Sequence, residues 1–485
     1  MKFKRQFTFS SLLLLLAVFF GSCSVGANET ETRQLEQPKN IIIFVSDGMG
    51  FNHLKASSYF EYGQSPAQLF EQSDWVSFAM ATYPSVLRVH EGDTIYSAGY
   101  NPQLASQDPE YPKLDYTDSG AAGTALSTGK KTYNGSIGIG IKGDTLLHMS
   151  QAAKALGKST GVVTSVQLSH ATPAAFIAHN EHRSNLSDIA RYMLFHSKTD
   201  VIMGAGNPGF NNDGQPAESS ARFVGGSEIW EILKANDGRT VFETSEGTFH
   251  VQDANGDGQP DPWTLIQTRE EFLKMASGAQ ASRVLGVPQV HTTLNQGRTQ
   301  IEDHSLPFQT PLNENVPTLE EMTRAAINVL SQNPEGFFVM VEGGAVDWAS
   351  HSNDNARVIE EQIDFNNSVN AVIEWVETYS SWNETLVIVT SDHECGYLTG
   401  PDDPDPIYQP VTNNGKGKLP GMQWHYGSHT NVLVPFFAKG PGADYFKLMA
   451  RENDPVYGPF IQNTDIASLV FMMWGKPEIT MHKLK

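Results

Sequence analysis

The chain has 485 residues, of which 39% are hydrophobic and 10% aromatic, and its formal net charge is −21. This composition excludes a disordered chain and suits a globular protein with a large core, built as one big α/β domain with insertions or as two domains. The acidic charge argues against a nucleic-acid-binding surface and against binding to anionic membranes. It also disfavours an anionic substrate unless bound cations reverse the local field.

The first 23 residues are typical of an export signal. A basic start precedes an apolar run over residues 12–20, which is too short to span a membrane. The run ends in Gly-Ser-Cys23, which resembles a bacterial lipoprotein signal with Cys23 as the lipidated residue. Cleavage without lipidation is the alternative. A polar tether over residues 24–38 would follow. We therefore expect an exported protein, in the periplasm or held at the outer membrane as a lipoprotein.

Apolar runs and helical patterns alternate along the rest of the chain. Strands are predicted over residues 40–46, 159–166, 336–341, 385–390 and 432–438, and helices over 145–156, 186–194, 317–330, 353–377 and 465–473. This alternation predicts an α/β fold with a central, mainly parallel sheet that helices flank on both faces. Regions of about 207–305 and 401–427 are rich in Gly, Asp, Asn or Pro, and they look like insertions on a domain that covers 39–485.

A serine stands at the start of a predicted small-residue helix in the segment Tyr-Thr-Asp118-Ser119-Gly-Ala-Ala-Gly-Thr. Because a helix N-terminus presents backbone N–H groups to an anion, this position suits a serine that accepts a phosphoryl group. An ordinary helix cap at Asp118 or Ser119 is the alternative. No general base lies close in the sequence, so a nucleophilic Ser119 would need activation from elsewhere in the chain.

Side chains that commonly bind metals lie at the ends of several predicted strands or in the segments that follow. They are Asp47, Glu342, Asp347, His351, Asp392, His393 and His429. Taken singly, each is as readily a helix cap or a surface group. In parallel sheets, however, ligands bind outside the carboxyl ends of the strands, so these side chains are expected to converge. Together they predict a site for zinc or magnesium.

In its motifs the chain resembles the alkaline phosphatases. The matching segments occur in the family's order, at residues 46–50, 117–119, 169–173, 178–183, 341–351, 391–393 and 427–429. The resemblance runs from about residue 40 to the C-terminus, apart from the insertions. It implies an alkaline-phosphatase-like fold and the metal-dependent hydrolysis of small phosphate monoesters, with release of inorganic phosphate. It also implies a homodimer as one oligomeric state, and a crown-like extension in the place of residues 401–427.

The resemblance further implies two zinc ions and a third ion, usually magnesium. Asp347, His351 and His429 match the first zinc site, Asp47, Asp392 and His393 the second, and Asp47, Thr172 and Glu342 the third. Ser119 would be the nucleophile that becomes phosphorylated, Arg183 would hold phosphate oxygens, and Asp118 would orient Arg183. One zinc would lower the pKa of the serine hydroxyl, and the other would stabilise the leaving oxygen and later activate a water.

Two positions depart from part of the family. His170 stands where some members have Asp, and Trp348 stands where others have Lys or His. A neutral imidazole weakens a preference for Mg²⁺, which favours oxygen ligands, so His170 would reach the third ion only through water. Trp348 would offer the substrate phosphate an N–H group but no charge. This difference predicts looser phosphate binding.

A separate pattern at residues 253–261 matches the start of an EF-hand-type calcium loop. Its oxygen-bearing side chains are Asp253, Asn255, Asp257, Gln259 and Asp261. The usual final Glu is missing, because Thr264 stands in its place, and a polar turn is the alternative. A calcium ion here would order the insertion and take no part in the chemistry.

Two rival functions stay open. A phosphodiesterase on the same scaffold would share the zinc half but lack the third site, whereas Glu342, Thr172 and Arg183 together favour monoesters. A non-catalytic, lipid-anchored binding protein would be indicated by a lost nucleophile or a broken metal set. The sequence shows neither, so a phosphomonoesterase is the leading prediction.

Overall fold

The structure is a computed structural model that describes residues 36–90, 93–96, 99–301, 304–401 and 408–475. The expected signal segment, including Cys23, and most of the expected tether lie outside the described residues. No helix in the described ranges combines the length and the apolar character needed to cross a membrane.

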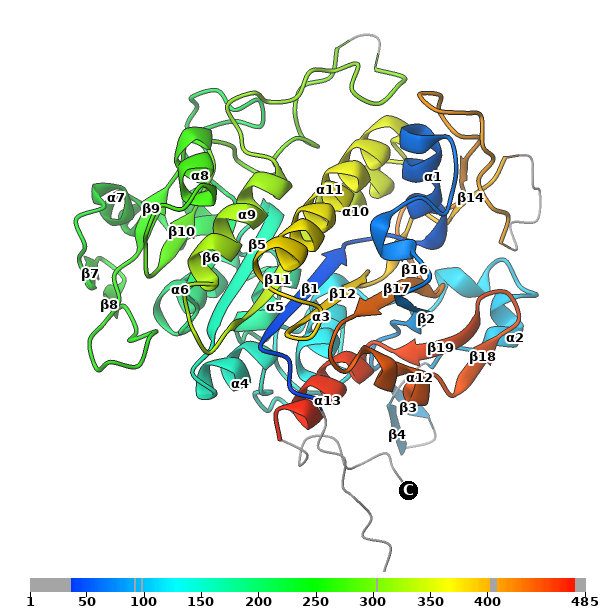
Figure 1. The fold of residues 1–485 in the computed structure, drawn as a ribbon, viewed down its shortest axis with the longest axis horizontal. Helices are drawn as coiled ribbons and strands as arrows, with labels where there is room; N and C mark the ends of the chain where they lie inside the picture. The colour runs from blue at the N-terminus through cyan, green and yellow to red at the C-terminus, as the bar shows by residue number, and fades with distance from the viewer. Residues whose placement is uncertain (1–35, 91–92, 97–98, 302–303, 402–407, 476–485) are drawn as a thin grey trace, which may run out of the picture. The chain divides into compact units, whose positions relative to one another are not determined.

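A sheet of 11 strands carries the fold (Figure 1). In spatial order its strands are β18 (Glu452–Asp454), β19 (Gly458–Gln462), β2 (Val76–Ala81), β17 (Val434–Lys439), β12 (Thr385–Thr390), β1 (Asn40–Ser46), β11 (Phe337–Gly343), β5 (Ser159–Gln167), β6 (Val201–Ala205), β10 (Val284–Gly286) and β9 (Thr264–Ile266). Every pairing from β12 to β9 is parallel, whereas β17 runs antiparallel to both of its neighbours. The prediction of a mainly parallel central sheet is confirmed.

The middle of this sheet is formed by β12, β1 and β11. Ile41 of β1 lies opposite Phe338 of β11 on one side and Leu386 of β12 on the other. Every residue of β1 is buried. A parallel strand that is covered on both faces has no solvent side, which explains why β1 and β12 are continuous apolar runs in the sequence.

Helices cover both faces of the sheet (Figure 1). One layer contains α1 (Phe51–Tyr62), α8 (Arg269–Ala276), α9 (Leu319–Leu330), α10 (Ala345–His351) and α11 (Asn355–Tyr379). The other contains α3 (Ser119–Thr128), α4 (Met149–Ala155), α5 (Ala171–Ile177) and α13 (Thr464–Met473). The remaining helices are α2 (Pro102–Ala105), α6 (Leu186–Phe195), α7 (Ser227–Ala235) and α12 (Phe446–Met449). A core of Val, Ile, Leu and Phe side chains fills the space between the sheet and the layer of α9 and α11.

Short two-stranded ribbons complete the described structure. They are β3 (Leu87–His90) with β4 (Asp93–Tyr96), β7 (Val241–Thr244) with β8 (Gly247–His250), β13 (Glu394–Cys395) with β16 (His429–Thr430), and β14 (Leu398–Thr399) with β15 (Gln423–Trp424). The ribbon of β13 and β16 matters most for the site, because it ties the end of β12 to the segment that carries His429.

The structure differs from the expected elements mainly at the edges of the sheet. Strands β2, β6, β18 and β19 were not predicted. Strands β9 and β10, of three residues each, extend the sheet from within region 207–305, which was expected to be an insertion. Such short strands carry too few residues for a periodic pattern, and their pairing is decided by tertiary contacts.

Candidate active site

The site is built where the three central strands end. Asp47 directly follows β1, Glu342 lies near the end of β11, and Asp392 and His393 follow β12. Because these strands are parallel neighbours, their carboxyl ends meet at one edge of the sheet. All four side chains have no exposed surface.

The turn after β1 requires a glycine. Gly48 has a φ of +80°, and a Cβ added to it would lie 2.8 Å from the Cα of Asp347. Its N–H donates to Oδ1 of Asp392 over 3.2 Å. A larger residue would therefore separate the segments that carry Asp47, Asp347 and Asp392.

Ser119 opens helix α3, and Asp118 caps that helix. Oδ1 of Asp118 accepts hydrogen bonds from the backbone N–H groups of Ala121 (2.9 Å) and Gly135 (3.0 Å). The Oγ of Ser119 lies 3.3 Å from Nε2 of His393 and accepts a hydrogen bond from Nη1 of Arg183 over 3.4 Å. The hydroxyl thus lies at a helix N-terminus, between an imidazole at the strand ends and a guanidinium group.

Arg183 is held in place by its neighbours. Nη1 donates to Oδ2 of Asp118 over 3.0 Å, and the Arg183 backbone N–H donates to the carbonyl of Gly135 over 2.7 Å. Nη2 lies 3.2 Å from Nε2 of His170. Burial and then the charge of Arg183 lower the pKa of His170 to about 3, so this imidazole is neutral. The ring of Trp348 meets that of His170 edge to face, with centroids 5.9 Å apart.

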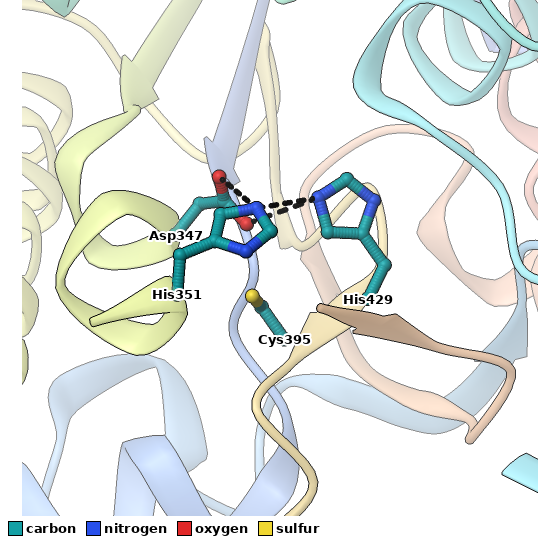
Figure 2. Close-up of side chains that lie close together, drawn as sticks. All are labelled: Asp347, His351, Cys395 and His429. Atoms are coloured by element: carbon teal, nitrogen blue, oxygen red, sulfur yellow. Dashed lines mark hydrogen bonds and ion pairs between the residues drawn. The ribbon is translucent and has the colours of Figure 1, made fainter. Parts of the chain in front are cut away.

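Asp347, His351, His429 and Cys395 form what we call the first group (Figure 2). Nε2 of His351 lies 3.1 Å from Nε2 of His429 and 3.4 Å from Oδ2 of Asp347, and Nε2 of His429 lies 3.4 Å from Oδ1 of Asp347. Each imidazole bonds a backbone carbonyl through its Nδ1, His351 to Gly427 and His429 to Thr117, both at 2.9 Å. These bonds put the proton on Nδ1 and leave both Nε2 atoms free to bind a cation.

Two further groups share Asp47. The second group contains Asp47, Asp392 and His393, and the third contains Asp47, His170 and Glu342. In each group one ligand atom per residue lies within 4.8 Å of the others. Thr172 is the second residue of α5, two positions after the His170 cap, and its buried hydroxyl has no hydrogen-bond partner.

Buried carboxylate oxygens without partners mark all three groups. Neither oxygen of Asp47 has a hydrogen-bond partner, nor does Oε1 of Glu342, Oδ1 of Asp347 or Oδ2 of Asp392. Burial raises the pKa of Asp47 above its usual value. It also raises the pKa of Glu342 to about 8 and the pKa of Asp392 to about 6. In each case the charges of neighbouring carboxylates add to the rise. Bound divalent cations would remove this penalty, and the oxygen and imidazole donors are those that zinc and magnesium use.

Sequence reasoning missed two side chains that touch these groups. Thr164, on β5, donates a hydrogen bond to Oε2 of Glu342. Cys395 lies in the first group and was not singled out by the sequence analysis. A signal for Cys395 was present, because it stands two residues after His393 on a segment that leaves the same strand end.

The predicted calcium loop is an exposed turn on the chain between β8 and β9. Oδ2 of Asp261 accepts from the N–H groups of Ala254 and Asn255, and the carboxylate of Asp253 accepts from those of Gly256 and Gly258. Among the described residues, these acids do not form a group whose ligand atoms converge as they do at the strand ends.

The chain is similar to known phosphatases along most of its length. The model of the alkaline phosphatase family matches residues 38–435. Alkaline phosphatase 4 of Bacillus subtilis is 31% identical over 369 residues, which cover 74% of this chain and 62% of the relative. The alignment therefore spans less than two thirds of that relative's length.

Solved structures share the fold. A cold-active alkaline phosphatase from a Shewanella species matches with a TM-score of 0.58 at 26% identity, covering 90% of this chain and all of that one. The alkaline phosphatase of the Antarctic bacterium TAB5 matches with a TM-score of 0.59 at 22% identity, covering 91% of this chain and 99% of that one. With the family model matching most of the chain, the strand-end site and the fold lead to one conclusion: this chain belongs to the alkaline phosphatase family.

Proposed function

We propose that the chain hydrolyses phosphate monoesters through a phosphoserine formed on Ser119. One observation carries the proposal: the Ser119 hydroxyl, at the N-terminus of α3, lies between His393 of the second group and the guanidinium of Arg183. A phosphoryl group at this point would meet the N–H groups of the helix end and the planar fork of Arg183. Asp118 would keep that fork oriented through its 3.0 Å ion pair.

The steps that the chain's own residues perform follow from these contacts. The Ser119 hydroxyl loses its proton to solvent as Oγ attacks phosphorus. The bond to the alcohol oxygen breaks, the phosphoryl group moves to the serine, and the alkoxide takes up a proton from solvent and leaves as the alcohol. Arg183 binds two non-bridging oxygens of the phosphoryl group while it is transferred. A water then attacks phosphorus from the side that the alcohol left, which restores Ser119 and releases inorganic phosphate. Cations held by the three groups would lower the pKa of the serine hydroxyl and stabilise the leaving oxygen.

We assign two zinc ions to the first and second groups and a magnesium ion to the third. Zinc suits the mixed imidazole and carboxylate donors, and magnesium suits the oxygens of Asp47, Glu342 and Thr172. In the TAB5 enzyme, a variant with Asp in place of a His binds Mg in its M3 site. His170 is the histidine of the third group here, so a similar His-to-Asp change would be expected to strengthen magnesium binding.

Metal content and a substrate comparison test the proposal together. Protein purified without chelator is analysed by mass spectrometry for metals, and hydrolysis of p-nitrophenyl phosphate is compared with that of bis(p-nitrophenyl) phosphate across pH. We expect zinc, a faster monoester rate, and loss of turnover in Ser119→Ala. Full activity without any divalent metal would refute the metal-dependent mechanism, and a faster diester rate would favour the phosphodiesterase.

We further propose that the protein is exported and anchored through lipid on Cys23. The motif at residues 20–23 supports this assignment, since a small residue precedes the cysteine at the end of a short apolar run. Metabolic labelling with palmitate tests it, with Cys23→Ser as the control. Equal label in parent and variant would contradict it.

A further inference from the structure

The first group contains one residue that the proposed reaction leaves without a role. Cys395 is fully buried, and Figure 2 shows its sulfur pointing toward the cluster of Asp347, His351 and His429. It is a free cysteine. Its Sγ lies within 4.8 Å of a ligand atom of each of the other three residues.

The other three members of the first group already have a spacing that suits a metal ion. Their ligand atoms are 3.1 to 3.4 Å apart, close to the edge of about 3.3 Å expected in a tetrahedral site with bonds of about 2.0 Å. A catalytic zinc keeps three protein ligands and one open position for water or substrate. Asp347, His351 and His429 already supply three, so a fourth protein ligand would close the position that the reaction needs.

Among the members of the first group, Asp347 is the one whose carboxylate needs a neighbouring group to orient it. It is 4% exposed, and its Oδ1 has no hydrogen-bond partner, although Nε2 of His429 lies at ion-pair distance, 3.4 Å away. Its backbone is packed against the turn at Gly48, where even one added carbon would collide with it. A carboxylate aimed into a metal site is normally oriented by a neighbouring group that does not itself bind the metal.

The backbone of Cys395 connects the same segments. Its N–H donates to the carbonyl of Gly48 over 3.0 Å, and in the β13–β16 ribbon it lies directly opposite His429. The residue is thus fixed between the turn beneath Asp347 and the strand that carries His429. Its side chain has little freedom to point elsewhere.

We propose that Cys395 is a positioning residue: its thiol packs against Asp347 and fixes that carboxylate for the metal of the first group. This inference depends on the proposed function, because it requires a metal at this group. A thiol is a weak hydrogen-bond donor and a good filler of a small buried space, so it can orient the carboxylate without competing for the open position.

Zinc affinity of two variants tests the role. In chelator-buffered titrations of the full chain, Cys395→Ala should bind the zinc of the first group about 10- to 100-fold more weakly. Cys395→Ser keeps a small donor and should recover most of that affinity. Val201→Ala, a buried change on β6 away from the groups, is the matched control: it should lower thermal stability without changing zinc affinity.

Cobalt substitution distinguishes positioning from direct binding. The cobalt form of the parent should show no thiolate-to-cobalt charge-transfer band, and the visible spectrum of the first-group cobalt should change in Cys395→Ala. A charge-transfer band that disappears in Cys395→Ser would overturn the proposal by making the sulfur a ligand. Unchanged zinc affinity in Cys395→Ala would overturn it too, whereas a parent without any bound metal would instead refute the proposed function.

Discussion

Carboxylates gather in two regions of the molecule. In one region several of their oxygens lack hydrogen-bond donors, and in the other the backbone supplies donors. At the ends of β1, β11 and β12, the oxygens of Asp47, Glu342 and Asp392 are buried and several have no hydrogen-bond partner. In the exposed turn at 253–261, the carboxylates of Asp253 and Asp261 accept hydrogen bonds from the backbone N–H groups of their own loop.

The difference separates a site that needs a cation from one that can exist without it. Burying an unpaired carboxylate costs several kcal/mol unless a counter-charge is present. At the strand ends the fold imposes that cost, and bound metals would remove it. In the 253–261 turn, backbone N–H groups and solvent already satisfy the carboxylates. Calcium would therefore order the loop without removing any cost of buried charge.

The largest effect should come from neutralising Asp47, which belongs to the second and third groups. Asp47→Asn should lower kcat/KM by at least about 10²- to 10³-fold, because it removes charge that holds the cations. The same change should raise the unfolding free energy of the metal-free protein by about 1–3 kcal/mol, since a buried unpaired charge disappears. Steady-state kinetics and denaturant unfolding in chelator measure the two effects. If metal-free Asp47→Asn is less stable than the metal-free parent, the buried charge of Asp47 is not destabilising, and the proposed difference between the two regions fails.

Removal of metal should destabilise the parent. A bound ion at 100 to 1,000 times its Kd contributes about 3–4 kcal/mol of unfolding free energy. Thermal unfolding with and without chelator should therefore differ by several degrees, and zinc should restore the higher transition. Identical transitions in protein that contains zinc would show that the strand-end carboxylates do not need a cation.

Glu361 offers a buried acid outside both regions. It lies on α11 with 5% of its surface exposed, and burial, with the charges of Asp364 and Glu360, raises its pKa to about 8. The folded state thus holds the proton more tightly than the unfolded state, so stability falls as pH rises from about 4.5 to about 8. Glu361→Gln should match the parent near pH 4 and exceed it above pH 8 by on the order of a few kcal/mol. Urea unfolding across this range tests the prediction, and equal curves would contradict it.

Trp348 should influence how tightly phosphate is held. Trp348→Lys places a cation beside His170, and it should lower the inhibition constant of inorganic phosphate about tenfold, because one charge-assisted hydrogen bond contributes about 1.5 kcal/mol. Product inhibition in a p-nitrophenyl phosphate assay measures it, with Trp348→Phe as the uncharged control. Unchanged inhibition would remove Trp348 from the phosphate site.

The smallest effect is expected in the 253–261 turn. Without calcium, Asp257→Ala should change stability by less than about 0.5 kcal/mol, as for an ordinary exposed substitution. Isothermal titration of the parent with calcium should give a heat that the variant lacks. If the parent gives no heat, the turn is only a polar turn.

The sequence predicted the central strands and the residue types at their ends because both depend on local patterns. The run at 40–46 is β1 without a residue of difference, and Asp47, Asp392 and His393 follow their strands as expected. The short edge strands β9 and β10 carry no such pattern, and the antiparallel direction of β17 has no local signal either. Pairing partners and direction are non-local properties.

By itself the sequence determined the α/β class, the candidate metal ligands at the strand ends and the serine at a helix start, because periodicity, capping and motif order depend on neighbouring residues. Only the tertiary structure decided which side chains meet. It brought Ser119 within 3.3 Å of His393, 274 positions away in the chain, and it placed the sulfur of Cys395 in the group with Asp347. The order of the strands in the sheet and the close packing at Gly48 determine these contacts, and neither can be predicted from spacing along the chain.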